Sequence, residues 1–491
     1  MRQALHIFKK DFRCFRYEIC LMLAVTAVFV VLQVRKSFGT PYGPLNSWEA
    51  ELLMVIIAAV LIGRLILAEA IPGDLQFWIT RPYRRSSLLG AKLLFIAVFV
   101  NLPILLAHLI IVILDGFPLV SSLPGLLWSQ VLLFAVVLAP SAALAAVCRN
   151  LASYILYAVV LAAIAFFLEA RLWEVAWVMD GLAVLVVIAI SAWVLCLQYK
   201  SRRTQLSRWS AIAGIVLGGA AMIAMPWSFA FAVQSRLSKQ PSLGTGVQIA
   251  FGPSPAISDW PTAKQPEGAV NVPIMVQGIP EGTELRPDAL VVSIEDSGGS
   301  STTVNPFSCA PVTRHSQPVG LVLRAVCRAD PDFVKNHGGG LVTLRGSIYL
   351  TLFGNSKSTT IPLSDAPINT SDGLQCYTDT VHAEWDVFCR SPFRWPGRLV
   401  YAKLGHTDAN SFEQTISYSP FPAELNLNPI ETRWASSYAY GPPPEVRDVT
   451  ILVKEPLAHL RRDFEARGVR LSAFMLPAMR VGVPPTELPI K

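Results

Sequence analysis

Long apolar segments fill the first half of this 491-residue chain and are missing from the second half. A helix needs roughly 20 apolar residues to cross a hydrocarbon core about 30 Å thick, because lipid offers no hydrogen-bond partners to bare backbone groups. This criterion predicts about seven membrane-spanning helices, at residues 19–34, 52–70, 88–114, 125–147, 151–168, 175–198 and 209–233. The buried core of a large soluble protein would need charged faces between these segments, and such faces are absent.

A different pattern follows from residue 234 onward, where apolar residues alternate with polar or neutral ones. The alternation is clear in residues 270–276 and 344–352, and a period of two is typical of half-buried strands. Turn-forming Gly, Pro, Asp and Asn residues separate these segments. The chain is therefore expected to combine an α-helical polytopic membrane domain, residues 18–233, with a mainly-β, sandwich-like soluble domain, residues 234–491.

One helix is expected inside this β domain, near residues 457–467. Leu457, Leu460 and Phe464 would share one helical face, while the charged residues between them would be solvated.

Residues 1–17 show a third pattern. Leu5, Phe8, Phe12 and Phe15 recur at helical spacing, and basic residues occupy the other face. This pattern predicts an amphipathic helix that lies on the membrane surface. A signal peptide is the alternative, but no small-residue cleavage site follows the first apolar segment.

The positions of the basic residues predict how the membrane half is oriented across the bilayer. They gather before the first span and in every second loop after it, and such loops stay preferentially in the cytoplasm. The N-terminus is therefore expected in the cytoplasm of a cell inner membrane, and an odd seventh crossing places the β domain outside. The net charge of +7 is explained by loops that face anionic lipid, so nucleic acid is not needed as a partner.

Cysteine spacing agrees with an oxidising compartment for the second half. Cys309 and Cys327 bracket one short segment, and Cys376 and Cys389 bracket another. Sequential pairing into two disulfides is the simplest of three possible connectivities. A zinc site is the alternative, but neither a CxxC pair nor suitable histidine spacing supports it.

The loop after the second span is the most informative segment. Asp74 is a plausible helix cap, residues 75–80 could form a short amphipathic turn, and Pro82 ends that turn before a basic cluster. Such an element would lie parallel to the membrane and offer Phe77 and Trp78 to a cytoplasmic partner. The alternative is an ordinary basic loop anchored by aromatic residues at the lipid headgroups.

These residues resemble a known family, the permease subunits of type-2 ABC transporters. The resemblance covers the amphipathic N-terminal helix, the end of the second span, the loop, and the Leu-Leu-Gly-Ala-Lys sequence that opens the third span. In that family the N-terminal element is called the elbow helix, and the loop is the coupling helix that docks on the ATPase subunit. The resemblance implies coupling residues here at Glu69, Gly73, Asp74, Phe77, Trp78, Arg81, Pro82, Arg84, Arg85 and Lys92. The chain departs from the family pattern at Ala70, in the Asp-Leu-Gln sequence after Gly73, and in its seventh span and outer domain.

The resemblance also implies partners. No GxxxxGK[ST] loop occurs in the chain, so ATP and Mg²⁺ would be bound by a separate ATP-binding-cassette ATPase subunit. The implied complex contains two such ATPases and a second copy of the permease, or a homologous permease. Export is the commoner direction of transport in the family.

Polar side chains inside the spans have structural interpretations. Arg64 is expected to snorkel, and Asn101, His108, Ser129 and Gln130 are expected to bridge helices rather than line a pathway. Pro103 and Pro140 are expected to kink their spans.

No enzymatic activity is expected. The histidines after residue 300, among them His459, lack metal-ligand spacing, and no GxSxG or HExxH motif occurs, so neither a catalytic nor a metal site is predicted. The sequence leaves two hypotheses open. One is a transporter permease, and the other is a polytopic membrane anchor or sensor whose outer β domain binds a ligand or a partner protein.

Overall fold

The structure is a computed structural model. It describes residues 2–37, 47–68, 85–172, 177–201, 204–224, 227–252, 269–304, 309–317, 320–337, 339–362, 364, 366–370, 373–379, 385–392, 399–404, 416–417, 429–437 and 448–474. The first half of the chain is helical and the second is mainly β, as the two hydropathy patterns predict.

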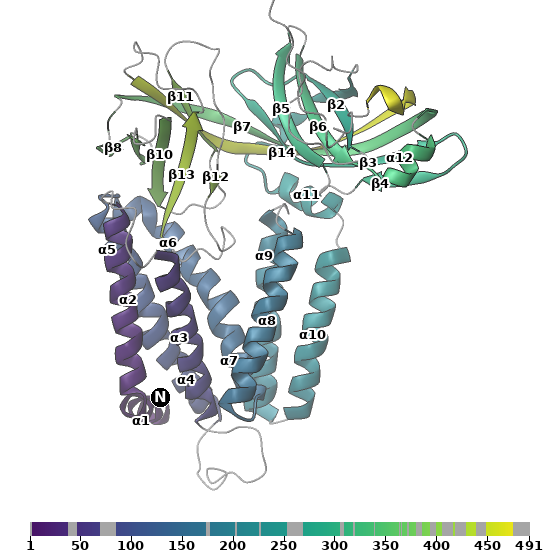
Figure 1. Ribbon diagram of the computed structural model, residues 1–491. Coiled ribbons are helices and arrows are strands. Elements are labelled where there is room, and N and C mark those ends of the chain that lie inside the picture. The colour runs from purple at the N-terminus through teal and green to yellow at the C-terminus, as the bar shows by residue number, and fades with distance from the viewer. Residues whose placement is uncertain are drawn as a thin grey trace, which may run out of the picture. The chain divides into compact units, whose positions relative to one another are not determined.

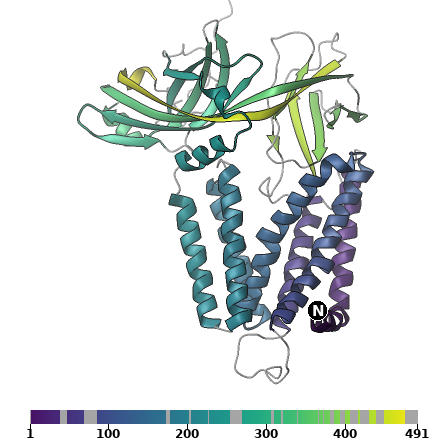
Figure 2. The ribbon, with the colours of Figure 1, turned by 180° about the vertical axis from the view of Figure 1, so that it is seen from behind.

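The helical half contains α-helices interrupted by short π-helical turns, labelled η2, η3 and η4. The elements are α1 Arg2–Cys14, α2 Arg16–Ser37, α3 Ser47–Leu67, α4 Arg85–Ile96, η2 Ala97–Asn101, α5 Leu102–Leu114, α6 Leu119–Leu133, η3 Phe134–Leu138, α7 Ala139–Val147, α8 Leu151–Leu172, α9 Trp177–Cys196, η4 Leu197–Ser201, α10 Thr204–Ala224 and α11 Trp227–Arg236. Helices α2 to α10 stand side by side, and α1 lies across the end at which α2 begins (Figures 1 and 2).

Five helical segments of the described chain are long and apolar enough to cross a membrane. They cover residues 16–34, 49–67, 86–114, 119–147 and 181–200. A shorter apolar segment, residues 151–164, lies at the expected fifth span. The expected seventh span, residues 209–233, is divided between α10 and α11. The described residues thus support a membrane protein with several spans.

Two of the prolines inside the spans follow π-helical turns. Pro103 stands at the start of α5 directly after η2, and Pro140 at the start of α7 directly after η3. Proline has no N–H to donate and clashes with the preceding turn, so a wider turn accommodates it. The π turns interrupt the α-helical hydrogen bonding just before both prolines, and the kinks expected there stay a prediction.

Small residues allow close helix packing. A Cβ on Gly63 would lie 2.5 Å from the Tyr154 ring, whose hydroxyl donates a 2.8 Å hydrogen bond to the Ala59 carbonyl. Cβ atoms on Gly214 and Gly218 of α10 would each lie 2.9 Å from a side chain of α9. A small-xxx-small spacing of this kind is typical of helix packing in membranes.

The β half contains three sheets of four, five and five strands. Their strands are β1 Gln248–Phe251, β2 Ala269–Gln277, β3 Glu284–Asp296, β4 Ser301–Val304, β5 Cys309–Gln317, β6 Gly320–Arg328, β7 Leu341–Pro362, β8 Ile368–Asn369, β9 Gln375–Asp379, β10 Trp385–Pro392, β11 Leu399–Leu404, β12 Ile416–Ser417, β13 Ile430–Ser437 and β14 Asp448–Arg470. The strand orders are β1-β2-β6-β5, β12-β13-β10-β9-β8 and β11-β14-β7-β3-β4. Helix α12, Pro331–His337, and the 3₁₀ turns η5 Pro241–Gly244 and η9 Leu471–Ala473 complete the described elements.

The chain divides into two compact units. Unit 1 comprises residues 1–225 and 357–453, and unit 2 comprises residues 226–356 and 454–491. The division begins at Pro226, whereas the sequence pattern placed the start of the soluble domain at Gln234. Strands β7 and β14 each contribute residues to both units. The β half is therefore not one unit: sheet β12-β13-β10-β9-β8 lies in the same unit as the helices.

The core of unit 2 confirms the predicted strands. Val270, Val272, Ile274 and Val276 on β2 are at most 1% exposed. They share one buried cluster with apolar side chains of β3, β6, β7 and β14, so two sheets enclose a common core. Residues 344–352 lie in β7, also as predicted.

The helix predicted at residues 457–467 is wrong, because this segment lies in strand β14. Leu460 and Phe464 are both buried, and a separation of four residues puts two side chains on one face of a helix or a strand. Hydrogen bonding within the sheet decides between helix and strand. Here the segment forms a strand, because β14 pairs with β11 on one side and with β7 on the other.

The predicted disulfide between Cys376 and Cys389 is confirmed. These residues lie directly opposite each other on β9 and β10. Cys327 is also disulfide-bonded, and the residue opposite it in the register of β5 and β6 is Cys309. The other cysteines, Cys14, Cys20, Cys148 and Cys196, are free thiols, as their scattered positions suggested.

Candidate functional site

The predicted coupling residues lie mostly in the loop between α3 and α4. Residues 69–84 are outside the described part of the chain. They include Glu69, Gly73, Asp74, Phe77, Trp78, Arg81, Pro82 and Arg84. Arg85 is the first residue of α4, but its side chain is not among those described. The structure therefore describes the two helices that flank this loop. Among the predicted coupling residues, Lys92 is the one whose side chain is described.

Lys92 is buried within the helices. It is 1% exposed, and its Nζ lies 2.8 Å from Oδ2 of Asp11 on α1, which is 2% exposed. Because two charges removed from water are stable only when they are well paired, this contact fixes α1 to α4. Lys92 has no surface for direct contact with a partner, so any part it plays in coupling is that of a positioning residue.

Aromatic rings surround this ion pair. Phe8 and Phe12 of α1 stack on Phe99 with ring centroids 5.6 and 5.4 Å apart. Phe15 meets Phe95 edge-on at 6.2 Å. Such aromatic contacts add roughly 0.5–1.5 kcal/mol each beyond the area they bury. Helix α1 therefore packs its aromatic face on α4 and η2.

The other end of the loop carries a second ion pair. Arg64, near the end of α3, pairs with Glu18 on α2, and its guanidinium also lies 6.0 Å from the centroid of the Phe15 ring. The Arg64 side chain is 48% exposed on the surface of the helical bundle. Exposed pairs of this kind contribute at most about 1 kcal/mol.

The two pairs together bracket the undescribed loop. Arg64 precedes residue 69 and Lys92 follows residue 84, and their acidic partners, Glu18 and Asp11, belong to neighbouring helices at the N-terminus. The two pairs therefore link α3 to α2 and α4 to α1 on either side of this loop. We call these four residues, Asp11, Glu18, Arg64 and Lys92, the loop anchor.

A further contact strengthens the same end of the helical bundle. Arg208, near the start of α10, donates hydrogen bonds of 2.9 and 2.8 Å to the Val147 carbonyl at the end of α7. A cation at a helix C-terminus satisfies an orphan carbonyl and complements the helix dipole. In the sequence, Arg208 stands out only as one of the basic residues of a loop between spans.

In the middle of the bundle, His108 and Gln130 bridge two helices. Gln130 Nε2 on α6 lies 3.2 Å from His108 Nδ1 on α5, and both residues are buried. This confirms the expected helix-bridging role for the pair. Ser129 instead donates to the Leu126 carbonyl within its own helix, at 2.8 Å.

A separate polar cluster lies inside unit 2. Thr351 Oγ1 donates to Asp288 Oδ2 at 2.5 Å and lies 2.8 Å from His459 Nδ1. The hydroxyl has one proton, which it gives to Asp288, and its oxygen can still accept a hydrogen bond. Gln234 Nε2 of α11 lies 3.0 Å from the same ring nitrogen. The cluster thus joins α11 to strands β3, β7 and β14.

Burial shifts the acid–base behaviour of this cluster. Desolvation raises the pKa of Asp288 to about 6, against the opposing hydrogen bond from Thr351. Desolvation also lowers the pKa of His459 to about 4. Both shifts favour the neutral form, which is the expected result of placing ionisable groups in an apolar interior. His459 is thus a packed histidine, as expected from its sequence context.

Among the residues that the structure describes, no group of three or more His, Cys, Asp or Glu side chains could hold a metal ion. Comparison of the sequence with protein-family models and with curated proteins found no match.

Proposed function

We propose that this chain is the membrane-spanning permease subunit of an ATP-driven transporter of the type-2 ABC class. The observation that carries the proposal is the loop anchor. Its two ion pairs tie both ends of loop 69–84 to α1 and α2, and one pair, Asp11–Lys92, is almost completely buried. A loop whose two ends are held in this way can transmit the movement of a bound partner protein to several helices at once.

In this proposal, the ATPase subunit binds and hydrolyses ATP with Mg²⁺, and its closure moves the loop. Arg81, Arg84 and Arg85, with Phe77 and Trp78, form the contact with the ATPase. The ion pair between Lys92 and Asp11 keeps α4 and α1 together while the ATPase moves the loop. Since conformational change must be carried by elements that move as bodies, a buried ion pair between two helices suits this role. Export of an unidentified substrate through a pathway between two permease copies is the proposed outcome.

The proposed orientation places the N-terminus in the cytoplasm and the β half outside. The Cys376–Cys389 disulfide supports it, since disulfides persist in oxidising compartments. A cysteine introduced for exposed Ala366 is expected to react with a membrane-impermeant maleimide added from outside the inner membrane. Reaction only after the membrane is permeabilised would contradict this orientation.

Co-purification tests the function. After extraction in mild detergent, the wild-type chain is expected to carry an ATP-hydrolysing subunit with it. The double variant Arg84→Glu, Arg85→Glu should lower the bound ATPase by roughly tenfold, the factor produced by about 1.4 kcal/mol of lost binding free energy. Arg149→Glu is the matched control, because Arg149 is an exposed arginine in a different loop. A wild-type chain that reproducibly purifies without an ATPase would overturn the permease proposal.

The second candidate is a polytopic anchor or sensor whose β half binds a ligand or partner. The extent of the β half favours it, since three sheets are more than a permease needs for coupling. The same experiment separates the two candidates, because the sensor requires no ATPase and should tolerate charge reversal in the loop.

A further inference from the structure

Helix α5 ends in a turn that fixes the carboxylate of Asp115. The Gly116 N–H donates to the Ile113 carbonyl and the Phe117 N–H to the Val112 carbonyl, both at 3.0 Å. This pair of bonds is a Schellman motif, and Gly116 has the positive φ of 77° that the motif requires. The side chain of Asp115, the last residue before this glycine, is 0% exposed.

Two side chains from sheet β12-β13-β10-β9-β8 meet this helix end. Arg390 Nη2 on β10 lies 2.5 Å from Asp115 Oδ2, and the arginine side chain is 9% exposed. Gln375 Nε2 on β9 donates to the main-chain carbonyl of Asp115 at 3.4 Å, and Arg390 Nη1 donates to Gln375 Oε1 at 3.4 Å. Two interactions stabilise a cation at this position, because it faces both a carboxylate and the negative end of a helix dipole.

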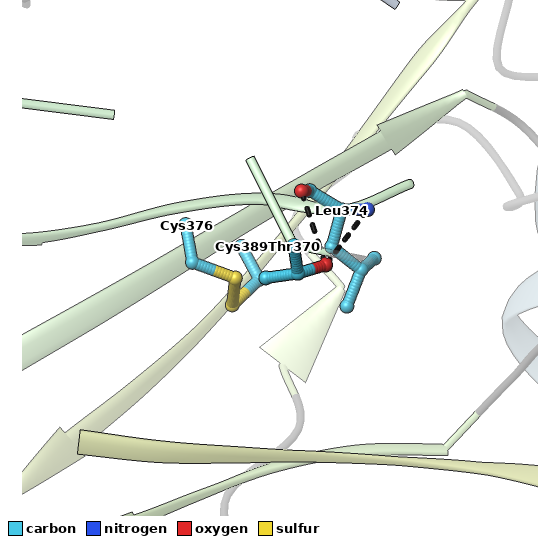
Figure 3. The surroundings of a disulfide bond; sticks show 4 residues. All are labelled: Thr370, Leu374, Cys376 and Cys389. Carbon is cyan, nitrogen blue, oxygen red and sulfur yellow. Dashed lines mark hydrogen bonds between the residues drawn. A yellow bond between two sulfur atoms is a disulfide. The ribbon is translucent and has the colours of Figure 1, made fainter. Parts of the chain in front are cut away.

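The disulfide lies beside these two side chains. Gln375 and Arg390 are register partners, and the next pair along the two strands is Cys376 with Cys389. Figure 3 shows the disulfide together with Thr370 and Leu374. The Thr370 hydroxyl donates to the Leu374 carbonyl and accepts from the Leu374 N–H, both at 3.2 Å (Figure 3). The Thr370 N–H also donates to the Leu374 carbonyl at 2.8 Å, and these bonds close the connection from β8 to β9. The covalent bond therefore holds together the two strands that reach Asp115.

A third contact comes from the same sheet. Ile430, the first residue of β13, is 3% exposed and belongs to the buried apolar cluster of the helical bundle. The sheet is therefore attached to the helices by apolar packing as well as by charge.

We propose that Gln375 and Arg390 form a clamp on Asp115, which we call the α5 clamp, and that the Cys376–Cys389 disulfide holds its two strands in register. Through this clamp, displacement of the sheet is passed to the turn between α5 and α6, and displacement of that turn is passed to the sheet. The clamp gives the sheet β12-β13-β10-β9-β8 a mechanical connection to the helices of the same unit. It does not depend on the proposed transport function, because a sensor would use the same connection.

Pulsed electron paramagnetic resonance on the full chain tests the clamp. In a parent with Cys14, Cys20, Cys148 and Cys196 replaced by alanine, maleimide spin labels are attached at Val120→Cys, next to the turn, and at Ala366→Cys, next to β8. Both positions are exposed, Val120 at 87%. The parent is expected to give one narrow distance distribution. Arg390→Ala and, separately, Cys376→Ala with Cys389→Ala should each broaden it at least twofold.

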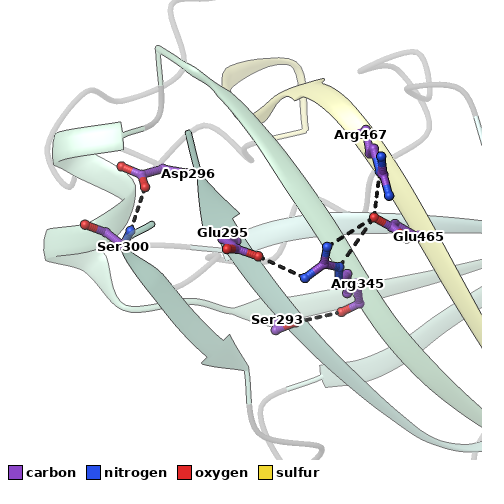
Figure 4. A network of polar contacts seen from close by, with 7 residues as sticks. All are labelled: Ser293, Glu295, Asp296, Ser300, Arg345, Glu465 and Arg467. Atoms are coloured by element: carbon purple, nitrogen blue, oxygen red, sulfur yellow. Dashed lines mark hydrogen bonds and ion pairs between the residues drawn. The ribbon is translucent and has the colours of Figure 1, made fainter. Parts of the chain in front are cut away.

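Arg345→Ala is the control. Arg345 lies in unit 2 and makes exposed contacts with Glu295 and Glu465 (Figure 4), so its removal should leave the distribution unchanged. If Arg390→Ala keeps the narrow distribution of the parent, the clamp is overturned. If only the disulfide variant keeps it, the role of the disulfide is overturned. Where Arg390→Ala does not yield monodisperse protein, Asp115→Asn removes the charge at nearly constant volume, and a narrow distribution there also overturns the clamp.

Discussion

Buried ion pairs of the same chemistry occur at opposite ends of the helical bundle and join very different segments. Asp11 and Lys92 connect two helices that are 81 residues apart, whereas Asp115 and Arg390 connect a helix end to a sheet 275 residues further along the chain. Each pair places a carboxylate against a cation with little access to water. Such a pair adds little net stability, but it fixes which segments are neighbours, because separating its members leaves an uncompensated charge.

The largest expected effect comes from breaking the Asp11–Lys92 pair on one side. Lys92→Met should lower the free energy of unfolding by about 3–5 kcal/mol, because Asp11 is left buried without its cation. Thermal unfolding in detergent measures the loss. The double variant Asp11→Leu, Lys92→Met should recover most of it, since neither charge then needs a partner. A double variant as unstable as the single one would show that the pair is not what holds α1 against α4.

The sequence contains a signal for this pair. Asp11 is three residues after Phe8 and four before Phe15, so it lies on the apolar face of α1. Lys92 is a lone charge within an apolar run. A charge on an apolar face requires a partner, although the pattern does not say which one. Arg390 gave no comparable signal, because its partner lies in a helix end that only tertiary folding brings near.

In the β half, the local sequence pattern predicts the secondary structure of one segment correctly and that of another wrongly. Residues 270–276 alternate strictly in sequence and form the strand β2, but both faces of the strand are covered: Asn271 is 1% exposed, and Met275 is half-buried. Residues 457–467 satisfy the helical period in part, but they continue β14, and hydrogen bonding to neighbouring strands outweighs the local preference. The local sequence pattern also does not predict the division of the chain at Pro226, because that division depends on which strands pair with each other.

Asp288 offers a carboxylate held mainly by a hydroxyl group for comparison. It accepts a hydrogen bond from Thr351, and desolvation raises its pKa to about 6 against the opposing effects of Thr351 and Arg286. A raised pKa means that the folded state holds the proton more tightly than the unfolded state. Stability is therefore lost as the pH rises from about 4 through about 6. The full shift corresponds to about 3 kcal/mol, and the partial exposure of Asp288 reduces the expected loss to about 1–2 kcal/mol.

His459 acts in the opposite direction. Its pKa is lowered to about 4, so stability is lost as the pH falls from about 6.5 through about 4. Asp288→Asn should therefore raise the stability of unit 2 at pH 8 and leave a decline toward pH 4. His459→Gln should leave only a decline toward high pH. Hydrogen exchange of the β14 amides in unit 2 across this pH range measures both effects. An Asp288→Asn variant with the wild-type pH profile would contradict the raised pKa.

The smallest effect is expected for an ion-pair network on the surface of unit 2. Arg345 lies 3.1 Å from Glu295 and 3.4 Å from Glu465, and the latter also pairs with Arg467 at 2.7 Å (Figure 4). The Arg345 side chain is 55% exposed, so water screens these contacts and compensates their loss. Arg345→Ala should lower the free energy of unfolding by less than about 1 kcal/mol, and the difference should vanish in high salt. A salt-independent loss as large as that for Lys92→Met would mean that burial is not what separates the strong ion pairs of this protein from the weak ones.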